Sequence, residues 1–164
     1  MNRMFKKIAC VRLLMLLVSG LCLVSTLASC TVESSDNGDF DGYWHLERID
    51  TLATNGVLDL SKKKIFWGVQ CKLVSCRYIR EDDTFSYYFR FRQTADSITL
   101  YSPYEDHWHQ DNGDNGGDVP VYAINDIIRS LGINNLEEPF YKEKLKGDKM
   151  ILTSKSLRLY FKKF

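Results

Sequence analysis

The chain has 164 residues with 22 Lys and Arg against 21 Asp and Glu, a formal net charge of +1. Every charged side chain before position 30 is basic, so the remaining 135 residues carry 18 basic and 21 acidic side chains, a net charge of −3. This mildly acidic balance lacks the basic footprint of a nucleic-acid-binding protein, and we expect no nucleic-acid partner. A length near 135 residues suits a single domain with one core.

The N-terminal segment has the order of an export signal. Four basic side chains precede or flank an apolar run from Leu13 to Leu23, and the small residues Ala28 and Ser29 precede Cys30. A membrane-spanning helix needs about 20 apolar residues, and this run is shorter and is followed by Ser and Thr. We therefore predict that residues 1–29 are a signal peptide.

The four residues Leu27-Ala28-Ser29-Cys30 resemble the lipobox of bacterial lipoproteins. The resemblance implies cleavage between Ser29 and Cys30, a diacylglycerol on the Cys30 sulfur, and three acyl chains such as palmitate in the mature protein. Two or more chains hold a protein stably at a membrane. Thr31, in place of Asp, is similar to the state that sorts lipoproteins of Gram-negative bacteria to the outer membrane. Periplasmic and surface display both remain open.

Residues 30–41 form a polar, acidic stretch with one aliphatic side chain, Val32. Such a composition buries too little apolar surface to order itself, so we predict a flexible tether. The predicted domain then covers residues 42–164.

From Gly42 onward the dominant hydrophobic period is two, which predicts β-strands. The clearest segment runs from Phe85 to Arg92, where every odd position is aromatic. Short polar turns such as Asn55-Gly56 and Gly147-Asp148 separate the segments and favour consecutive antiparallel pairing. The predicted strands cover residues 43–52, 65–79, 84–92, 97–101, 138–145, 150–153 and 157–164.

The segment 65–79 contains Cys71 and Cys76, the two cysteines of the predicted domain. Five positions along one strand separate their Cα atoms by roughly 16 Å, and a disulfide tolerates only about 7 Å. The inward face switches within the segment, which a bulge near Leu73 or Val74 would explain. We predict two buried, small apolar side chains, and the sequence leaves their redox state open.

Residues 123–131 break the period of two. Ile124, Ile127, Ile128 and Leu131 follow helical spacing, and Gly132 stands where a helix would end. An antiparallel sheet of this length with one apolar face tends to close, because closure removes exposed edges. We therefore predict a mainly β protein, an antiparallel meander closed into a barrel of about seven or eight strands with one short helix near residues 123–131 at one end.

The opening Gly42-Tyr43-Trp44 resembles the Gly-x-Trp signature of lipocalins, and the last two strands are similar to the terminal hairpin of lipocalin-like bacterial lipoproteins of unknown function. The resemblance implies a lipocalin-like barrel in which Trp44 packs across the closed end beneath a basic residue, with Arg158 as the candidate. The chain departs from lipocalins in placing its helix before three strands instead of one.

Catalytic motifs are absent from the sequence, so we expect neither an enzyme nor a cofactor. His107 and His109 flank Trp108 and are weak candidates for part of a zinc site, but a solvated loop is the favoured interpretation. The acidic stretch 111–118 does not fit the spacing of a calcium loop.

A barrel of about eight strands is either filled by its own side chains or holds one small ligand. Six aromatic residues are candidates to line a binding site, although plain core packing is the favoured interpretation: Trp67, Tyr78, Phe85, Tyr87, Phe89 and Phe91. Two hypotheses remain. The protein binds a small apolar or amphipathic ligand, or it is a structural or accessory envelope lipoprotein that acts through protein or glycan contacts. The sequence does not indicate the oligomeric state.

Overall fold

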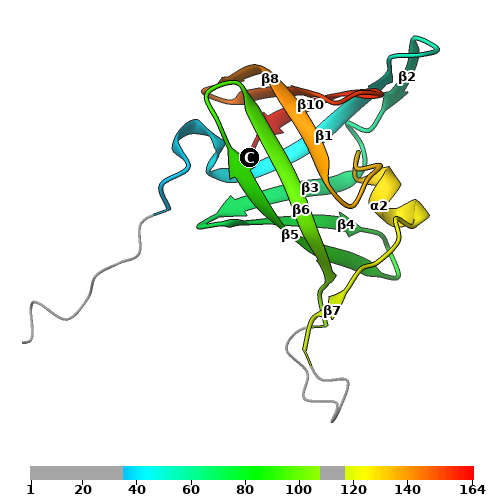
Figure 1. The fold of residues 1–164 in the computed structure, drawn as a ribbon. Helices are drawn as coiled ribbons and strands as arrows, with labels where there is room; N and C mark the ends of the chain where they lie inside the picture. The colour runs from blue at the N-terminus through cyan, green and yellow to red at the C-terminus, as the bar shows by residue number, and fades with distance from the viewer. Residues whose placement is uncertain (1–34, 108–116) are drawn as a thin grey trace, which may run out of the picture. The chain divides into compact units, whose positions relative to one another are not determined.

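The computed structural model describes residues 35–107 and 117–164 (Figure 1), which belong to one compact unit, Ser35–Phe164. No helix in these ranges is long and apolar enough to cross a membrane. Within these ranges a 3₁₀ helix, η1 (Gly38–Phe40), comes first, and one short α-helix follows the seventh strand. The elements after η1 are β1 (Gly42–Thr51), β2 (Gly56–Asp59), β3 (Lys64–Gln70), β4 (Leu73–Ile79), β5 (Thr84–Gln93), β6 (Ser97–Glu105), β7 (Val119–Pro120), α2 (Asp126–Ser130), β8 (Glu138–Lys146), β9 (Lys149–Thr153) and β10 (Leu157–Lys163).

Eight of the strands form a closed antiparallel barrel in the order β1-β3-β4-β5-β6-β8-β9-β10. The last strand returns to the first, with Trp44 opposite Lys163 at one end of the pairing and Thr51 opposite Leu157 at the other. Strands β2 and β7 are short additions that pair with β1 and β6. The predicted antiparallel barrel is confirmed (Figure 1).

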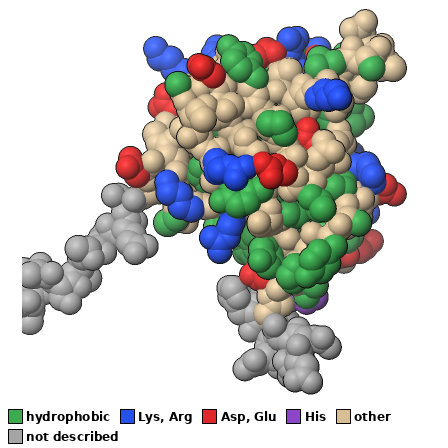
Figure 2. Space-filling view, viewed as in Figure 1, with side chains coloured by type: hydrophobic (Ala, Val, Ile, Leu, Met, Phe, Trp, Pro, Cys, Tyr) green, Lys and Arg blue, Asp and Glu red, His purple; other side chains and the backbone are tan. Residues whose placement is uncertain are grey.

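The barrel interior takes the alternate residues that the period of two assigns to it. On β5 the side chains of Tyr87, Phe89 and Phe91 are buried, whereas Arg90 and Arg92 between and beyond them are exposed. The outward side carries charges of both signs, and Figure 2 shows Lys and Arg interspersed with Asp and Glu over the face in view. This pattern places one apolar core inside the barrel.

The predicted continuous strand over residues 65–79 is wrong, because the chain reverses there. Strands β3 and β4 pair from Gln70–Leu73 onward, and Cys71 and Lys72 form the two-residue turn between them. Cys71 has a φ of 53°, a left-handed conformation that few side chains adopt. The inward-facing positions switch between residues 65–70 and 73–79 because these residues belong to two different strands, and the predicted bulge near Leu73 or Val74 is wrong.

Because of this turn, the two cysteines differ in their exposure to solvent. Cys76 is fully buried opposite Trp67, as predicted, and burial raises the pKa of its thiol well above the usual range. Cys71 is exposed, so the prediction of a buried side chain is wrong for this residue. Both cysteines are free.

Residues 35–41 pack on the barrel, which corrects the predicted tether for this part of the stretch. Phe40 is fully buried, and its ring meets that of Phe91 edge to face at a centroid distance of 5.2 Å. The Asp41 carboxylate accepts hydrogen bonds from Ser35 Oγ (2.5 Å) and from the backbone and side-chain amides of Asn37 (2.9 and 2.6 Å). One aromatic side chain and one carboxylate thus fix a stretch whose composition predicts disorder.

Residues 35–41 also form hydrogen bonds with the left-handed turn at Cys71. Ser35 Oγ accepts from the Cys71 backbone N–H at 2.7 Å, and Asn37 Nδ2 donates to the Cys71 carbonyl at 2.6 Å. Both polar groups of the left-handed residue are therefore satisfied by side chains more than 30 positions earlier in the chain.

The predicted helix exists but is shorter, covering Asp126–Ser130. Asn125 caps its N-terminus by accepting from the Ile128 N–H at 2.8 Å, an interaction typical of Asn at this position. Gly132 ends the helix with a φ of 88°. Beyond the helix, Leu131 and Ile133 are fully buried, and the Leu131 carbonyl accepts from Trp67 Nε1 at 3.2 Å. The helix and the residues after it thus cover one end of the barrel (Figure 1).

We predict that Gly132→Ala destabilises the domain far more than Gly147→Ala. Both glycines have positive φ, so each substitution costs about 1 kcal/mol in backbone strain. A Cβ at position 132 would also lie 2.8 Å from a Leu159 methyl carbon, while nothing lies within 4 Å of one at position 147. Overpacking adds about 1–3 kcal/mol. Urea denaturation measures the difference, and equal losses for the two variants would contradict it.

We predict that Asp41→Asn destabilises the domain at neutral pH and that this effect fades in acid. Burial raises the pKa of Asp41, but the hydrogen bonds from Ser35 and Asn37 outweigh it and leave the pKa below its usual value. A lowered pKa means that the carboxylate stabilises the fold fully above about pH 4 and loses this effect as the pH falls through the lower value.

The expected loss for Asp41→Asn is about 1 kcal/mol at pH 7. Urea denaturation between pH 7 and pH 3 measures it, with Asp39→Asn on the exposed side of η1 as the control. A pH-independent loss, or an equal loss in the control, would show that the carboxylate does not hold the segment.

Candidate functional site

Trp44 lies at the end of the barrel that η1 covers. Its side chain is fully buried, and Nε1 donates to the Phe40 carbonyl at 2.9 Å. The cation above its ring is Lys163, whose Nζ lies 4.9 Å from the ring centroid. This end of the barrel is therefore closed by an aromatic ring, a backbone carbonyl and a lysine.

The structure corrects the predicted role of Arg158 at this end. Leu159 and Phe161 point inward, so Arg158 falls on the outward face of β10, where its guanidinium pairs with Glu143 at 2.8 Å. Its cross-strand neighbour on β1 is Asp50, and Trp44 pairs instead with Lys163 at the other end of the strand. Because side chains alternate along β10, the basic residue that contacts Trp44 is Lys163 and not Arg158.

The six aromatic residues proposed from the sequence all belong to the inward set of β3, β4 and β5, but they divide into two groups. Trp67, Tyr87, Phe89 and Phe91 are at most 6% exposed. Trp67 contacts the rings of Phe140 and Phe161 at centroid distances of 5.8 and 4.9 Å. These side chains fill the middle of the barrel.

Tyr78 and Phe85 form the second group. They are cross-strand neighbours near the end of the barrel opposite Trp44, and both are only partly buried. They line a solvent-open cleft of about 580 Å³, together with Lys62, Lys63, Lys64, Ile79, Arg80, Glu81, Asp82 and Asp83. We call this cleft the mouth.

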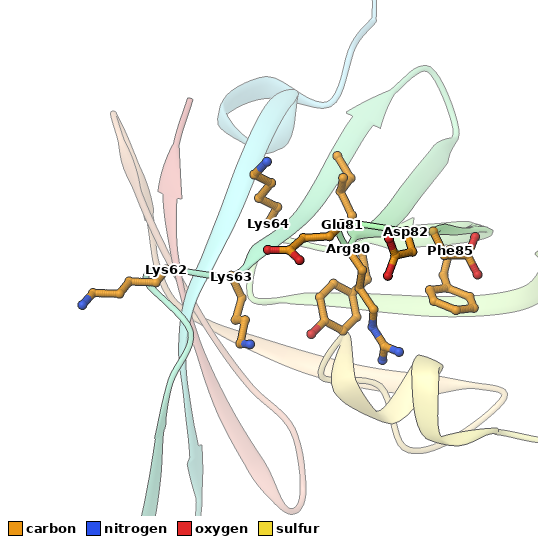
Figure 3. A pocket seen from close by; sticks show the side chains of 10 residues that line it. Lys62, Lys63, Lys64, Arg80, Glu81, Asp82 and Phe85 are labelled. Atoms are coloured by element: carbon orange, nitrogen blue, oxygen red, sulfur yellow. The ribbon is translucent and has the colours of Figure 1, made fainter.

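Arg80 lies across the aromatic floor of the mouth. Its guanidinium carbon is 4.6 Å from the Tyr78 ring centroid and 5.0 Å from that of Phe85, within the range of cation–π contacts. Figure 3 shows Arg80 and Lys63 extending toward the side where α2 lies, whereas Lys62 points away. The mouth therefore presents two aromatic rings beneath a cationic group, with carboxylates at its rim.

The wall beneath the mouth is held by α2. Asn125, the N-cap residue of α2, donates from Nδ2 to the Tyr87 hydroxyl at 3.0 Å. Burial raises the pKa of Tyr87, although the hydrogen bond from Asn125 works against the rise. The tyrosine is therefore neutral at physiological pH, and its hydroxyl links β5 to the N-terminus of α2.

Arg80 is not among the site residues predicted from the sequence. The signal was present, because Arg80 stands two positions after Tyr78 and so continues the inward period of β4 past the end of the strand. The arrangement of a cation over two rings depends on the β4–β5 turn and is not visible in the sequence.

Of the two candidate metal ligands, His107 and His109, the structure describes only His107. His107 is half-buried, and its backbone N–H donates to Asp118 Oδ1 at 3.3 Å, while Trp108 and His109 lie outside the described residues. In residues 35–107 and 117–164 no three His, Cys, Asp or Glu side chains gather as metal ligands.

A closed eight-stranded antiparallel barrel with η1 against Trp44, α2 near the other end and an aromatic cleft open to solvent defines the class of small barrels that are filled by side chains or hold one small ligand. The sequence model of the lipocalin-like domain matches residues 24–164, and the chain belongs to this family.

Two solved structures share the fold. A lipocalin-like protein from Bacteroides uniformis is 16% identical with a TM-score of 0.55, and the match covers 77% of this chain and 100% of that one. An uncharacterized protein from Bacteroides eggerthii is 15% identical with a TM-score of 0.53, and the match covers 76% of this chain and 98% of that one. No match was found among curated proteins.

Proposed function

We propose that the protein is a non-enzymatic, lipid-anchored envelope protein that binds one small amphipathic molecule at the mouth of its barrel. The observation that carries this proposal is the position of Arg80 over Tyr78 and Phe85 in an open cleft. Two partly exposed rings offer apolar contact, and a guanidinium offers charge-assisted hydrogen bonds to an acidic headgroup.

The dimensions support a ligand at the mouth and not deep in the barrel. The cleft volume of about 580 Å³ lies within the range of small-molecule sites. The filled layer of Trp67, Phe89 and Phe91 leaves the mouth as the place where the interior aromatics reach solvent. Arg80 forms no ion pair with the described residues, so its donors can serve an acidic ligand.

The anchor is proposed from the sequence. Leu27-Ala28-Ser29-Cys30 provides the lipobox, with Cys30 as the site of lipid attachment and the outer membrane of a Gram-negative cell as the destination. The periplasmic and the surface-exposed face are both compatible with this proposal.

The second candidate function is that of a structural or accessory envelope lipoprotein without an interior ligand. The observation that favours it is the same filled layer, in which Trp67 packs on Phe140 and Phe161. An empty mouth in the protein from its own host would favour this alternative.

We predict that native mass spectrometry of the protein, purified gently from its host, shows an additional small mass bound one to one. Arg80→Gln and Phe85→Ala should each weaken binding at least tenfold, because each removes about 1.5–3 kcal/mol of contact. The control is Lys155→Gln, an exposed lysine between β9 and β10 that does not line the mouth. A protein that stays empty, even after incubation with fatty acids and lysophospholipids, would refute ligand binding at this site.

We predict that Cys30→Ser moves the protein from the detergent phase to the aqueous phase in Triton X-114 partitioning, because the variant lacks the sulfur that would carry the lipid. Cys71→Ser is the matched control, since Cys71 is an exposed free thiol of the folded domain. If Cys30→Ser partitions like the wild type, the lipobox interpretation is wrong.

A further inference from the structure

A second hollow lies on the outside of the barrel, across β1, β3, β4 and β5. Its volume is about 900 Å³, and its lining includes Tyr43, Gly68, Leu73, Ser75, Arg77 and Tyr88. The pairing registers place four of these residues in one cross-strand row, Tyr43–Gly68–Ser75–Tyr88. Two small residues thus form a floor between two tyrosines, and we call this hollow the outer groove.

Tyr43 is a fixed wall of the outer groove. Its ring stacks on Phe66 with a centroid distance of 4.9 Å and an interplanar angle of 15°, and Phe164 meets both rings edge to face. A Cβ on Gly68 would lie only 3.2 Å from Tyr43 Cδ2, so the ring rests directly against the glycine. Although Tyr43 is 36% exposed, its neighbours therefore hold the orientation of its ring.

Tyr88 is the opposite wall. Its hydroxyl bonds to Asp106 Oδ2 at 3.1 Å and also pairs with Arg77. Burial and the Asp106 carboxylate raise the pKa of Tyr88, so the phenol stays neutral. The ring is held at its polar end, and its apolar part borders the groove.

The outer groove continues beyond Tyr88. A neighbouring hollow of about 480 Å³ shares Leu73 and Tyr88 with it and adds Arg90, Tyr104 and Asp118. Tyr104 is the cross-strand neighbour of Tyr88, so the row of outward residues extends onto β6. From β1 to β5 alone the row spans three inter-strand steps, roughly 14 Å.

The charges along the outer groove are balanced. Arg77 and Arg90 face the two hollows together with Asp41 and Asp118. A polyanion or a polycation would meet like charges as well as opposite ones, whereas a neutral ligand with many hydroxyl groups meets no like charge and can form hydrogen bonds beside groups of either sign. A purely apolar ligand would leave these polar groups desolvated and unpaired.

We propose that the outer groove binds a neutral carbohydrate chain. A sugar ring has an apolar C–H face that packs on an aromatic ring and a rim of hydroxyl groups that need donors and acceptors, and the lining of the groove contains both kinds of group. The distance between Tyr43 and Tyr88 exceeds a single sugar ring, so the ligand is an oligosaccharide or polysaccharide. This site is separate from the mouth and does not depend on a ligand there.

Affinity electrophoresis of the full protein in gels that contain neutral polysaccharides tests the proposal. The probes are starch, xylan, galactomannan and β-glucan, and we expect retardation by at least one of them. Tyr43→Ala should weaken binding at least tenfold, and Tyr43→Phe should restore it, because stacking needs the ring and not the hydroxyl. Gly68→Val should also abolish binding, because its side chain fills the floor against Tyr43.

Two controls separate this site from the rest of the protein. Tyr141→Ala removes another exposed tyrosine, on β8, and should leave retardation unchanged. Phe85→Ala at the mouth should also leave it unchanged, which distinguishes a failure of this proposal from a failure of ligand binding at the mouth. Absence of retardation by every probe, or equal losses in Tyr43→Ala and Tyr141→Ala, would overturn the proposal.

Discussion

The pairing of β1 with β10 is the interaction on which the rest of the structure depends. One edge of β1 pairs with β10 along the strand, and its other edge pairs first with β3 and then with β2. The bulge between Leu46 and Arg48 lies where the partner changes from β3 to β2. Without this seam the sheet would have an open edge, and neither an enclosed core nor two distinct ends would exist.

Closure gives the same strands two different surfaces. Alternate residues of β4 and β5 supply Tyr78 and Phe85 to the mouth, and Arg77 and Tyr88 to the outer groove. The two sites therefore share a backbone while their side chains point in opposite directions. The filled core between them, centred on Trp67, separates them physically.

The sequence predicts most of the barrel because a half-buried strand must alternate, as residues 85–92 do. It fails at Cys71 because the left-handed turn is stabilised by Ser35 and Asn37, partners that no local pattern reveals. It fails at residues 35–41 because a single phenylalanine, Phe40, outweighs a polar composition once a barrel end is there to receive it. Arg158 and Lys163 lie on opposite faces and at opposite ends of β10, and only the register of the β1–β10 pairing shows which of them lies beside Trp44. Only part of the candidate site could be predicted from the sequence. The inward positions of Tyr78 and Phe85 follow from the period of two, but the contact of Arg80 with both rings depends on the turn after β4.

The seam also has a kinetic consequence. It joins the first strand of the barrel to the last, and the Phe164 N–H donates to the Tyr43 carbonyl at 2.8 Å beside it. Contacts between such distant parts of a chain must pay a large loop-closure entropy before they contribute stability, and folds dominated by them form slowly. The core can be sealed only when the C-terminal strand is available, so the barrel is acquired as a whole and a chain that stops before β10 retains an unpaired, aggregation-prone edge.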